Sequence, residues 1–231
     1  MPKKIMKIAV LNYSGNVGKT TIARDLLKPN LTDYEIITID TVNADGQETM
    51  LLKGEDDRQI YVELLVQDNV ILDIGSSNLE AYLKNSQKYR DLLNIVDKFI
   101  IPTTTDKKQH ADSLKTVADL INFGIDKNKI FVMVNRVEKE KEDMFSEIIA
   151  PYSKVKINIV KTFIPRHELY DIGGLVSTRA ADETDYRALM EEKRKKGDMD
   201  KARDFANMFV LQQTAISMNE KYLQIFNEIF N

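Results

Sequence analysis

The residues with the clearest chemistry form one short run, Gly18-Lys19-Thr20-Thr21, which follows an apolar stretch and precedes a helical pattern. In such a turn, backbone N–H groups point at phosphate oxygens and the helix N-terminus adds its dipole. Lys19 would reach the terminal phosphates, and the Thr20 hydroxyl would hold Mg²⁺. The first glycine of the pattern G-x-x-x-x-G-K-[ST] would fall on position 13, which is Tyr13. The run therefore predicts a phosphate-binding loop that departs from the common pattern at its first position.

A carboxylate suited to the same site lies near the end of a second apolar strand-like run, residues 69–74. Asp73 follows three apolar residues, as expected for an acidic side chain at the end of a buried strand that helps to hold a metal ion. The alternative is that the GKTT run is a chance helix start and Asp73 an ordinary strand-end residue. The order of strand, loop and helix over residues 7–27 favours the nucleotide site.

The elements that would position these groups alternate along the chain. After the helix that follows the loop, apolar and β-branched runs predict strands at 35–40, 69–74, 98–102, 129–135 and 158–164. Helical spacing predicts helices at 79–96, 110–123 and 138–149, the second ending at Gly124. Strands that alternate with helices form a mostly parallel sheet flanked by helices, so the predicted fold class is α/β, of the P-loop NTPase type.

Polar residues and prolines collect at the carboxyl ends of these predicted strands, where open parallel sheets bind their ligands. They are Asn12, Asp40, Asp73, Pro102, Asn135 and Pro165. The sequence therefore places its polar groups at the edge of the sheet where a nucleotide would lie.

Composition limits the classes of protein to which the chain can belong. Its 231 residues are 43% hydrophobic, which is enough for a full core. We expect one domain, with a core over about 1–176 and a helical C-terminal region over about 177–231. The absence of cysteine excludes disulfides and thiolate metal sites. The apolar residues after Lys3 and Lys4 are few and are needed for the first strand, and no run is long enough for a membrane span. We therefore expect a cytoplasmic protein.

The C-terminal quarter differs in character from the rest of the sequence. A helix is predicted from about residue 198 to 230, with apolar residues at three-to-four spacing along a broad stripe. We expect this stripe to pack against the domain or against a partner helix. The charged run 191–196 is expected to form a solvated helix face, or alternatively a patch for a partner or DNA. The net charge of −3 gives no general attraction for nucleic acid, so contact with DNA would need such a local patch.

The order of these motifs resembles the ParA/MinD branch of P-loop ATPases, in which the Walker A motif is of the deviant type. The segments that carry the resemblance are SGNVGKTT, ITID, ILDIGSS and FIPRHELYDIGG, within residues 5–174. Inside that branch, NYSGNVGKTTIARDLL resembles the StbB plasmid stability proteins of conjugative plasmids. The resemblance implies a protein that binds ATP with Mg²⁺ and helps to maintain or position a plasmid.

The loop of this family, K-G-G-x-G-K-[ST]-T, falls on eight successive positions. They are Ser14, Gly15, Asn16, Val17, Gly18, Lys19, Thr20 and Thr21. Ser14 takes the place of the signature lysine, a cation that would stabilise the transferring phosphoryl group. The family's second switch aspartate falls on Val42, which cannot orient water, while Asp40 keeps the first. Asp45 is either a substitute for it or an ordinary turn residue. The resemblance implies ATP binding with slow hydrolysis, with Lys19, Asp40 and Asp45 as the candidate catalytic residues.

The remaining site residues come from the same resemblance. It implies that Thr20 and Asp73 hold Mg²⁺, and that Asn135, Pro165 and Arg166 contact the base. Asn135 is alternatively explained as the first residue of an Asx turn. The two histidines, His110 and His167, are expected to be surface or capping residues.

The leading hypothesis is a nucleotide-dependent switch or scaffold in plasmid stability, positioning and conjugation. By resemblance, its partners would be a second copy of the chain and a small plasmid DNA-binding protein. An alternative is an ATP-dependent small-molecule ligase of the dethiobiotin-synthetase type, which shares the scaffold and a V-G-K-T loop. A third is a P-loop relative that binds no nucleotide. The charged, helical C-terminal quarter favours a protein surface over a small-molecule site.

Overall fold

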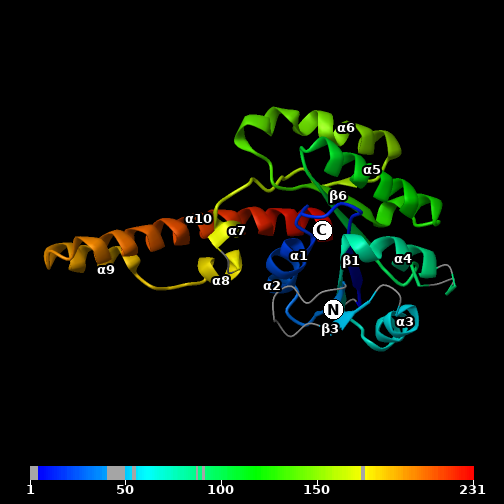
Figure 1. The fold of residues 1–231 in the computed structure, drawn as a ribbon, viewed down its shortest axis with the longest axis horizontal. Coiled ribbons are helices and arrows are strands. Elements are labelled where there is room, and N and C mark those ends of the chain that lie inside the picture. The colour runs from blue at the N-terminus through cyan, green and yellow to red at the C-terminus, as the bar shows by residue number, and fades with distance from the viewer. Residues whose placement is uncertain (1–4, 41–49, 54–55, 87, 90–91, 173–174) are drawn as a thin grey trace. The chain divides into compact units, whose positions relative to one another are not determined.

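A computed structural model of the chain describes residues 5–40, 50–53, 56–86, 88–89, 92–172 and 175–231. The chain forms two units (Figure 1). The first joins Met1–Arg166 to Ile225–Asn231, and the second is His167–Gln224. The predicted α/β sheet lies in the first unit, and so do the residues of the predicted nucleotide site.

Seven strands of the described residues form one parallel sheet in the order β3-β2-β4-β1-β5-β6-β7. They are β1 (Lys7–Leu11), β2 (Glu35–Ile39), β3 (Met50–Leu52), β4 (Val70–Ile74), β5 (Lys98–Thr103), β6 (Ile130–Val134) and β7 (Asn158–Ile159). Every residue of β1, β4 and β6 is buried, as expected for central strands with helices on both faces. The predicted fold class is therefore confirmed. The sequence did not predict β3, which is only three residues long.

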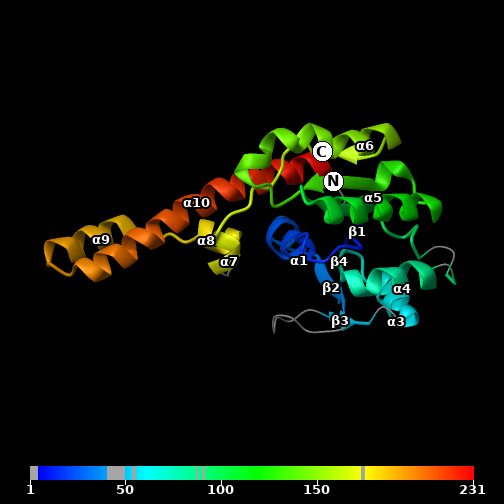
Figure 2. The same ribbon diagram turned by 45° about the horizontal axis from the view of Figure 1, so that its top comes forward.

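Helices cover both faces of this sheet. In chain order the first unit contains α1 (Lys19–Thr21), the π-helical turn η1 (Ile22–Leu27), α2 (Lys28–Asn30), α3 (Asp57–Val66), α4 (Ser76–Ser86), α5 (Lys107–Asn122) and α6 (Phe145–Val155). Figures 1 and 2 show α3 beside α4, and α5 beside α6. Ala9 and Leu11 of β1 join the large apolar core, whereas the alternate residues Ile8 and Val10 point to the opposite face and are also buried.

The observed helices differ from the predicted ones mainly at their ends. The helix predicted at 79–96 is α4, which begins earlier, at Ser76, and ends at Ser86. The Ser86 hydroxyl donates to the Leu83 carbonyl at 2.6 Å in its last turn. The helix predicted at 110–123 is α5, which begins earlier because the Asp106 carboxylate accepts from the N–H groups of Lys108 and Gln109, each at 3.0 Å. Gly124 ends α5 with φ 86°, as predicted.

The last residues of the chain belong to the first unit. Ile225 and Ile229 are buried there. The Glu228 carboxylate accepts hydrogen bonds from the backbone N–H of Lys161 and from the N–H of Thr162, the latter at 3.1 Å, and also from the Thr162 hydroxyl. These contacts fix the end of the final helix to the turn that follows β7.

The second unit is helical in its described residues. It contains α7 (Leu169–Ile172), α8 (Val176–Ala180), α9 (Tyr186–Lys195) and most of α10 (Met199–Phe230). The Gln212 amide donates to the carbonyls of Asp182 and Thr184 at 2.5 and 3.1 Å, and the hydroxyls of Tyr170 and Tyr222 lie 2.7 Å apart. The predicted C-terminal helix is confirmed as α10. Among the described residues, no helix combines the length and apolar character needed to cross a membrane.

Candidate functional site

The loop between β1 and α1 has the conformation of an anion-binding turn. Asn16 has φ 58° and Gly18 has φ 89°, both in the left-handed region, which asparagine tolerates and glycine adopts without strain. A Cβ at Gly18 would lie 2.1 Å from the Asn135 amide nitrogen, so this position also needs glycine for space. The sequence GNVGKT therefore meets the backbone requirements of the loop at both left-handed positions.

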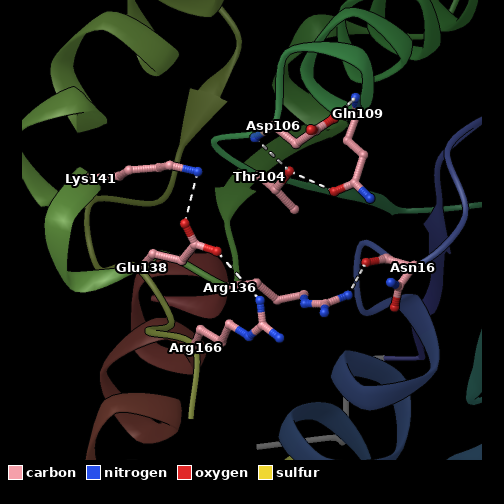
Figure 3. A network of polar contacts seen from close by, with 8 residues as sticks. All are labelled: Asn16, Thr104, Asp106, Gln109, Arg136, Glu138, Lys141 and Arg166. Atoms are coloured by element: carbon pink, nitrogen blue, oxygen red, sulfur yellow. Dashed lines mark hydrogen bonds and ion pairs between the residues drawn. The ribbon is translucent and has the colours of Figure 1, made fainter.

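Four successive carbonyls of the loop accept hydrogen bonds from side chains. The bonds are Lys19 Nζ to Ser14 O at 2.7 Å, Gln109 Nε2 to Gly15 O at 3.5 Å, Arg136 Nη1 to Asn16 O at 2.5 Å, and Asn135 Nδ2 to Val17 O at 2.8 Å. Figure 3 shows Arg136 reaching across to Asn16. Within the described part of the chain, the N–H groups of residues 15–18 donate no hydrogen bond. Side chains therefore fix the carbonyl groups of the loop, while its backbone N–H groups are available to bind an anion.

Lys19 lies under this loop with 8% of its surface exposed. Burial lowers the pKa of its ammonium group, and the nearby carboxylates of Asp73 and Asp40 partly oppose that effect. A buried cation that donates to the Ser14 carbonyl can stabilise phosphate oxygens strongly, because solvent screens it little. The predicted role of Lys19 at the terminal phosphates stays a prediction.

The residues predicted to hold Mg²⁺ lie together. The Thr20 hydroxyl hydrogen-bonds the carboxylate of Asp73, which is 2% exposed at the end of β4. The Oδ2 atom of Asp73 is buried and has no hydrogen-bond partner among the residues that the structure describes. Burial raises the pKa of Asp73, while Thr20 and Lys19 lower it. A hydroxyl beside an unsatisfied carboxylate oxygen fits Mg²⁺, which commonly takes one or two protein oxygens together with phosphate oxygens and water.

Asp40 lies against the segment that follows β4. A Cβ at Gly75 would lie 2.5 Å from Asp40 Oδ2, so this close approach requires glycine. The Ser77 hydroxyl and the Asn78 amide donate to Asp40 Oδ1 at 3.4 and 3.3 Å. The end of β2 and the segment that follows β4 are thus in contact. Val42 and Asp45 lie outside the described residues, and their predicted roles are untested.

Asn135 directly follows β6, beside the phosphate loop. Its amide nitrogen donates to Val17 O at 2.8 Å, and its Oδ1 accepts from the Arg136 N–H at 2.8 Å. Both ends of the side chain therefore contact protein, and its predicted contact with the base stays a prediction. Pro165 forms a parallel bridge with Val137, and the Arg166 guanidinium lies 3.4 Å from Glu138 Oε1. Figure 3 shows Arg166 directed at Glu138.

Sequence reasoning missed several residues that shape the loop. Tyr13, in the place of the usual first glycine, packs its ring under the Lys115 ammonium at 4.4 Å and donates from its hydroxyl to Asp119 at 2.8 Å. Its N–H donates to the Thr116 hydroxyl at 3.1 Å. Gln109 and Arg136 were also missed. Gln109, Thr116 and Asp119 are spaced along one face of α5, and this spacing was the signal that could have identified the packing of α5 against the loop.

The histidines play no part in the described site. The His110 Nδ1 atom lies 3.4 Å from the Tyr152 hydroxyl, and burial lowers the pKa of its imidazole. His110 is therefore half-buried between α5 and α6 and not a surface residue. His167 accepts from the Leu169 N–H at 3.2 Å at the start of α7, which is a capping contact as expected.

The comparisons with known proteins agree with this geometry. The profile of the CobQ/CobB/MinD/ParA nucleotide-binding domain matches residues 8–173. No curated protein matches the chain. Solved structures with the same fold include a Borrelia burgdorferi protein described as a plasmid partition protein bound to AMPPNP. It is 18% identical, with a TM-score of 0.53, over 90% of this chain and 99% of that chain.

Two further solved structures share the fold. The MinD protein of Pyrococcus horikoshii in complex with Mg-ADP is 10% identical, with a TM-score of 0.52, over 98% of this chain and 96% of that one. The ATP complex of a McdA variant from Cyanothece is 16% identical, with a TM-score of 0.51, over 93% of this chain and 97% of that one. At these identities the likeness shows the fold alone.

Proposed function

Because the chain belongs to the CobQ/CobB/MinD/ParA family of nucleotide-binding domains, we propose that it is a switch that binds ATP with Mg²⁺. Two neighbouring features carry this proposal. The N–H groups of the loop have no acceptor among the described residues, and the Thr20–Asp73 pair has one buried carboxylate oxygen without a hydrogen bond. The loop would take the phosphates, and Thr20 and Asp73 would take the metal. When bound, the metal would neutralise charge on the terminal phosphates.

The switch itself would involve the two segments that meet at Asp40. The Gly75 N–H donates to Ile39 O at 2.8 Å, and Asp40 accepts from Ser77 and Asn78, so the two segments are coupled by direct contacts. A terminal phosphate that orders one segment would therefore bias the other. Ser14 supplies no cation to the transferring phosphoryl group, so we infer slow hydrolysis by the chain alone. Lys19 would stabilise charge during that step, with Asp40 and Asp45 beside the attacking water.

The biological role that we propose is in plasmid stability, positioning and conjugation, like that of StbB plasmid stability proteins. The resemblance of NYSGNVGKTTIARDLL to those proteins supports it, and so does the shared fold with a protein described as a plasmid partition protein. A small plasmid DNA-binding protein and a second copy of the chain are the proposed partners. Asn135, which contacts the loop at Val17, would line the base together with Pro165 and Arg166.

The test is titration of the protein with Mg-ATP by calorimetry, for the natural chain and for Lys19→Ala. The natural chain should bind, and Lys19→Ala should lose at least about a hundredfold in affinity, because a buried charge-assisted contact with phosphate disappears. Its melting temperature should stay close to that of the natural chain, since burial of Lys19 is itself unfavourable. Unchanged affinity in Lys19→Ala would show that the loop is not the nucleotide site.

A further inference from the structure

Arg136 has a backbone conformation that its side chain disfavours. Its φ is 56°, in the left-handed region, where a residue with a Cβ is strained and glycine is not. Only three described non-glycine residues have positive φ, and the other two are Asn16 and Lys156. Strained residues of this kind persist where the surroundings enforce them, and they collect at functional sites.

Backbone hydrogen bonds on both sides of Arg136 enforce this conformation. The Asn135 N–H donates to Thr103 O at 2.7 Å, and the Val137 N–H donates to Ile164 O at 3.0 Å. The chain therefore turns sharply between two residues that are fixed to neighbouring segments. As a result the Arg136 side chain points at the phosphate loop, where Nη1 donates to Asn16 O at 2.5 Å (Figure 3).

The charges around the loop indicate what a cation there would do. The carboxylates of Asp73 and Asp40 attract the Lys19 ammonium group and raise its pKa. The Arg24 guanidinium likewise attracts the Asp73 carboxylate and lowers its pKa. The formal charges of these two cations and two carboxylates sum to zero, whereas a magnesium-bound triphosphate adds net negative charge. Arg136 brings a further positive charge that is joined to the loop by a direct hydrogen bond. A guanidinium group can keep this bond and still present other N–H donors to an anion.

Two neighbouring cations are less suited to this role. Lys141 Nζ lies 2.8 Å from Glu138 Oε2, and Arg166 Nη1 lies 3.4 Å from Glu138 Oε1, with 41% and 55% of their side chains exposed. Both share the charge of one carboxylate, and neither donates a hydrogen bond to the loop within the described part of the chain. Lys141 is therefore a matched control, because it is a cation of the same network that does not touch the loop.

We propose that Arg136 is a nucleotide-binding residue of this site, which holds the Asn16 carbonyl with one N–H and stabilises the bound polyphosphate with its charge. This inference rests on the proposed function. It explains why a residue that favours other backbone conformations occupies a position suited to glycine. The strain would be offset when a polyphosphate binds.

The experiment compares Arg136→Gly, Arg136→Gln, Arg136→Lys and Lys141→Gln with the natural chain. Calorimetry gives the affinities for ATP, ADP and AMP with Mg²⁺, and a thermal melt gives the Tm without nucleotide. Arg136→Gly should have an equal or higher Tm, because glycine relieves the strain. It should bind ATP about tenfold more weakly, as expected for one partly screened charge. ADP affinity should fall less and AMP affinity least.

The other variants separate charge from shape. Arg136→Gln should resemble Arg136→Gly in binding, Arg136→Lys should keep part of the ATP affinity, and Lys141→Gln should change none of the affinities. Equal losses for all three nucleotides, or no loss in Arg136→Gln, would overturn the inference. A lower Tm for Arg136→Gly would show that the side chain is structural, and would also overturn it. Failure of the natural chain to bind ATP would instead remove the proposed function.

Discussion

Asp73 carries a charge that the folded protein does not fully compensate. It is 2% exposed, it contacts Thr20, and its Oδ2 has no hydrogen-bond partner among the described residues. Burial raises the pKa of this carboxyl group. An unpaired buried oxygen destabilises a protein until a ligand or a metal ion satisfies it. At the scale of one residue, burial of the Asp73 carboxylate therefore costs stability, and binding of a metal ion would remove that cost.

We predict that Asp73→Asn raises the Tm of the metal-free protein at neutral pH. The folded-state pKa of Asp73 lies above its unfolded value, so the stabilisation from its proton is complete below the unfolded pKa and is lost as the pH rises through the folded pKa. The amide mimics the protonated form, so its advantage should shrink as the pH falls into the acid range. Thermal melts between neutral and acid pH check the sign.

The same variant should lose its response to metal. In the natural chain, Mg²⁺ should strengthen ATP binding, whereas Asp73→Asn should bind ATP with an affinity that Mg²⁺ barely changes, because the neutral amide is a poor ligand for a hard cation. A natural chain that binds ATP equally well with and without Mg²⁺ would contradict the assignment of Thr20 and Asp73.

Gly18 allows a second prediction for a single residue. Gly18→Ala would place a Cβ 2.1 Å from the Asn135 amide, whereas the same change at Gly124, with a similar φ of 86°, meets nothing within 4 Å. Gly124→Ala should destabilise the protein by about 1 kcal/mol from the backbone alone. Gly18→Ala should cost clearly more, and it should also weaken ATP binding. Denaturant unfolding measures the stability of both variants. Similar losses in the free energy of unfolding would refute the close approach of Gly18 to Asn135.

At the scale of elements, the end of α10 is fixed to the turn after β7 by one side chain. Glu228 accepts from the N–H of Thr162 at 3.1 Å and from the N–H of Lys161. We predict that Glu228→Ala destabilises the chain by about 1 kcal/mol, the usual contribution of such hydrogen bonds. Glu220→Ala is the control, since Glu220 is exposed on the same helix. Urea unfolding measures both, and equal stabilities would show that the anchor contributes nothing.

Much of the arrangement of elements could be predicted from the sequence. Apolar β-branched runs identified the central strands, because strands buried on both faces are almost continuously apolar. The strand predicted at 158–164 is shorter as β7 (Asn158–Ile159), although Val160 and Ile164 still donate to carbonyls of β6 at 2.9 and 3.0 Å. The helix predicted at 138–149 begins as a 3-10 turn over Lys139–Met144 and continues as α6.

The candidate site was only partly predictable for a physical reason. Lys19, Thr20 and Asp73 belong to motifs with fixed spacing, and the structure brings them together. Arg136 belongs to no such motif. Its left-handed backbone is imposed by hydrogen bonds to Thr103 and Ile164, which lie far from it in the sequence. Conformations that depend on tertiary partners leave no local pattern in a single sequence.

At the scale of the whole molecule, the test of the switch is its state of assembly. We predict that the molar mass doubles with Mg-ATP and stays at the monomer value without nucleotide and with Mg-ADP, because only the terminal phosphate would order the segments around Asp40 and Gly75. Light scattering measures this mass directly. A mass unchanged across the three conditions would argue against a nucleotide-dependent dimer and would leave the partner protein as the next component to add.

The return of residues Ile225–Asn231 to the first unit also has a consequence for biosynthesis. A chain that emerges from the ribosome presents the seven strands of the sheet long before it presents Ile229 and Glu228. Domains normally fold as units during synthesis, starting from the N-terminal side. Here the nucleotide-binding unit must wait for the whole of His167–Gln224 to be translated before its last contacts can form. The order of translation thus makes the second unit a precondition for completing the first.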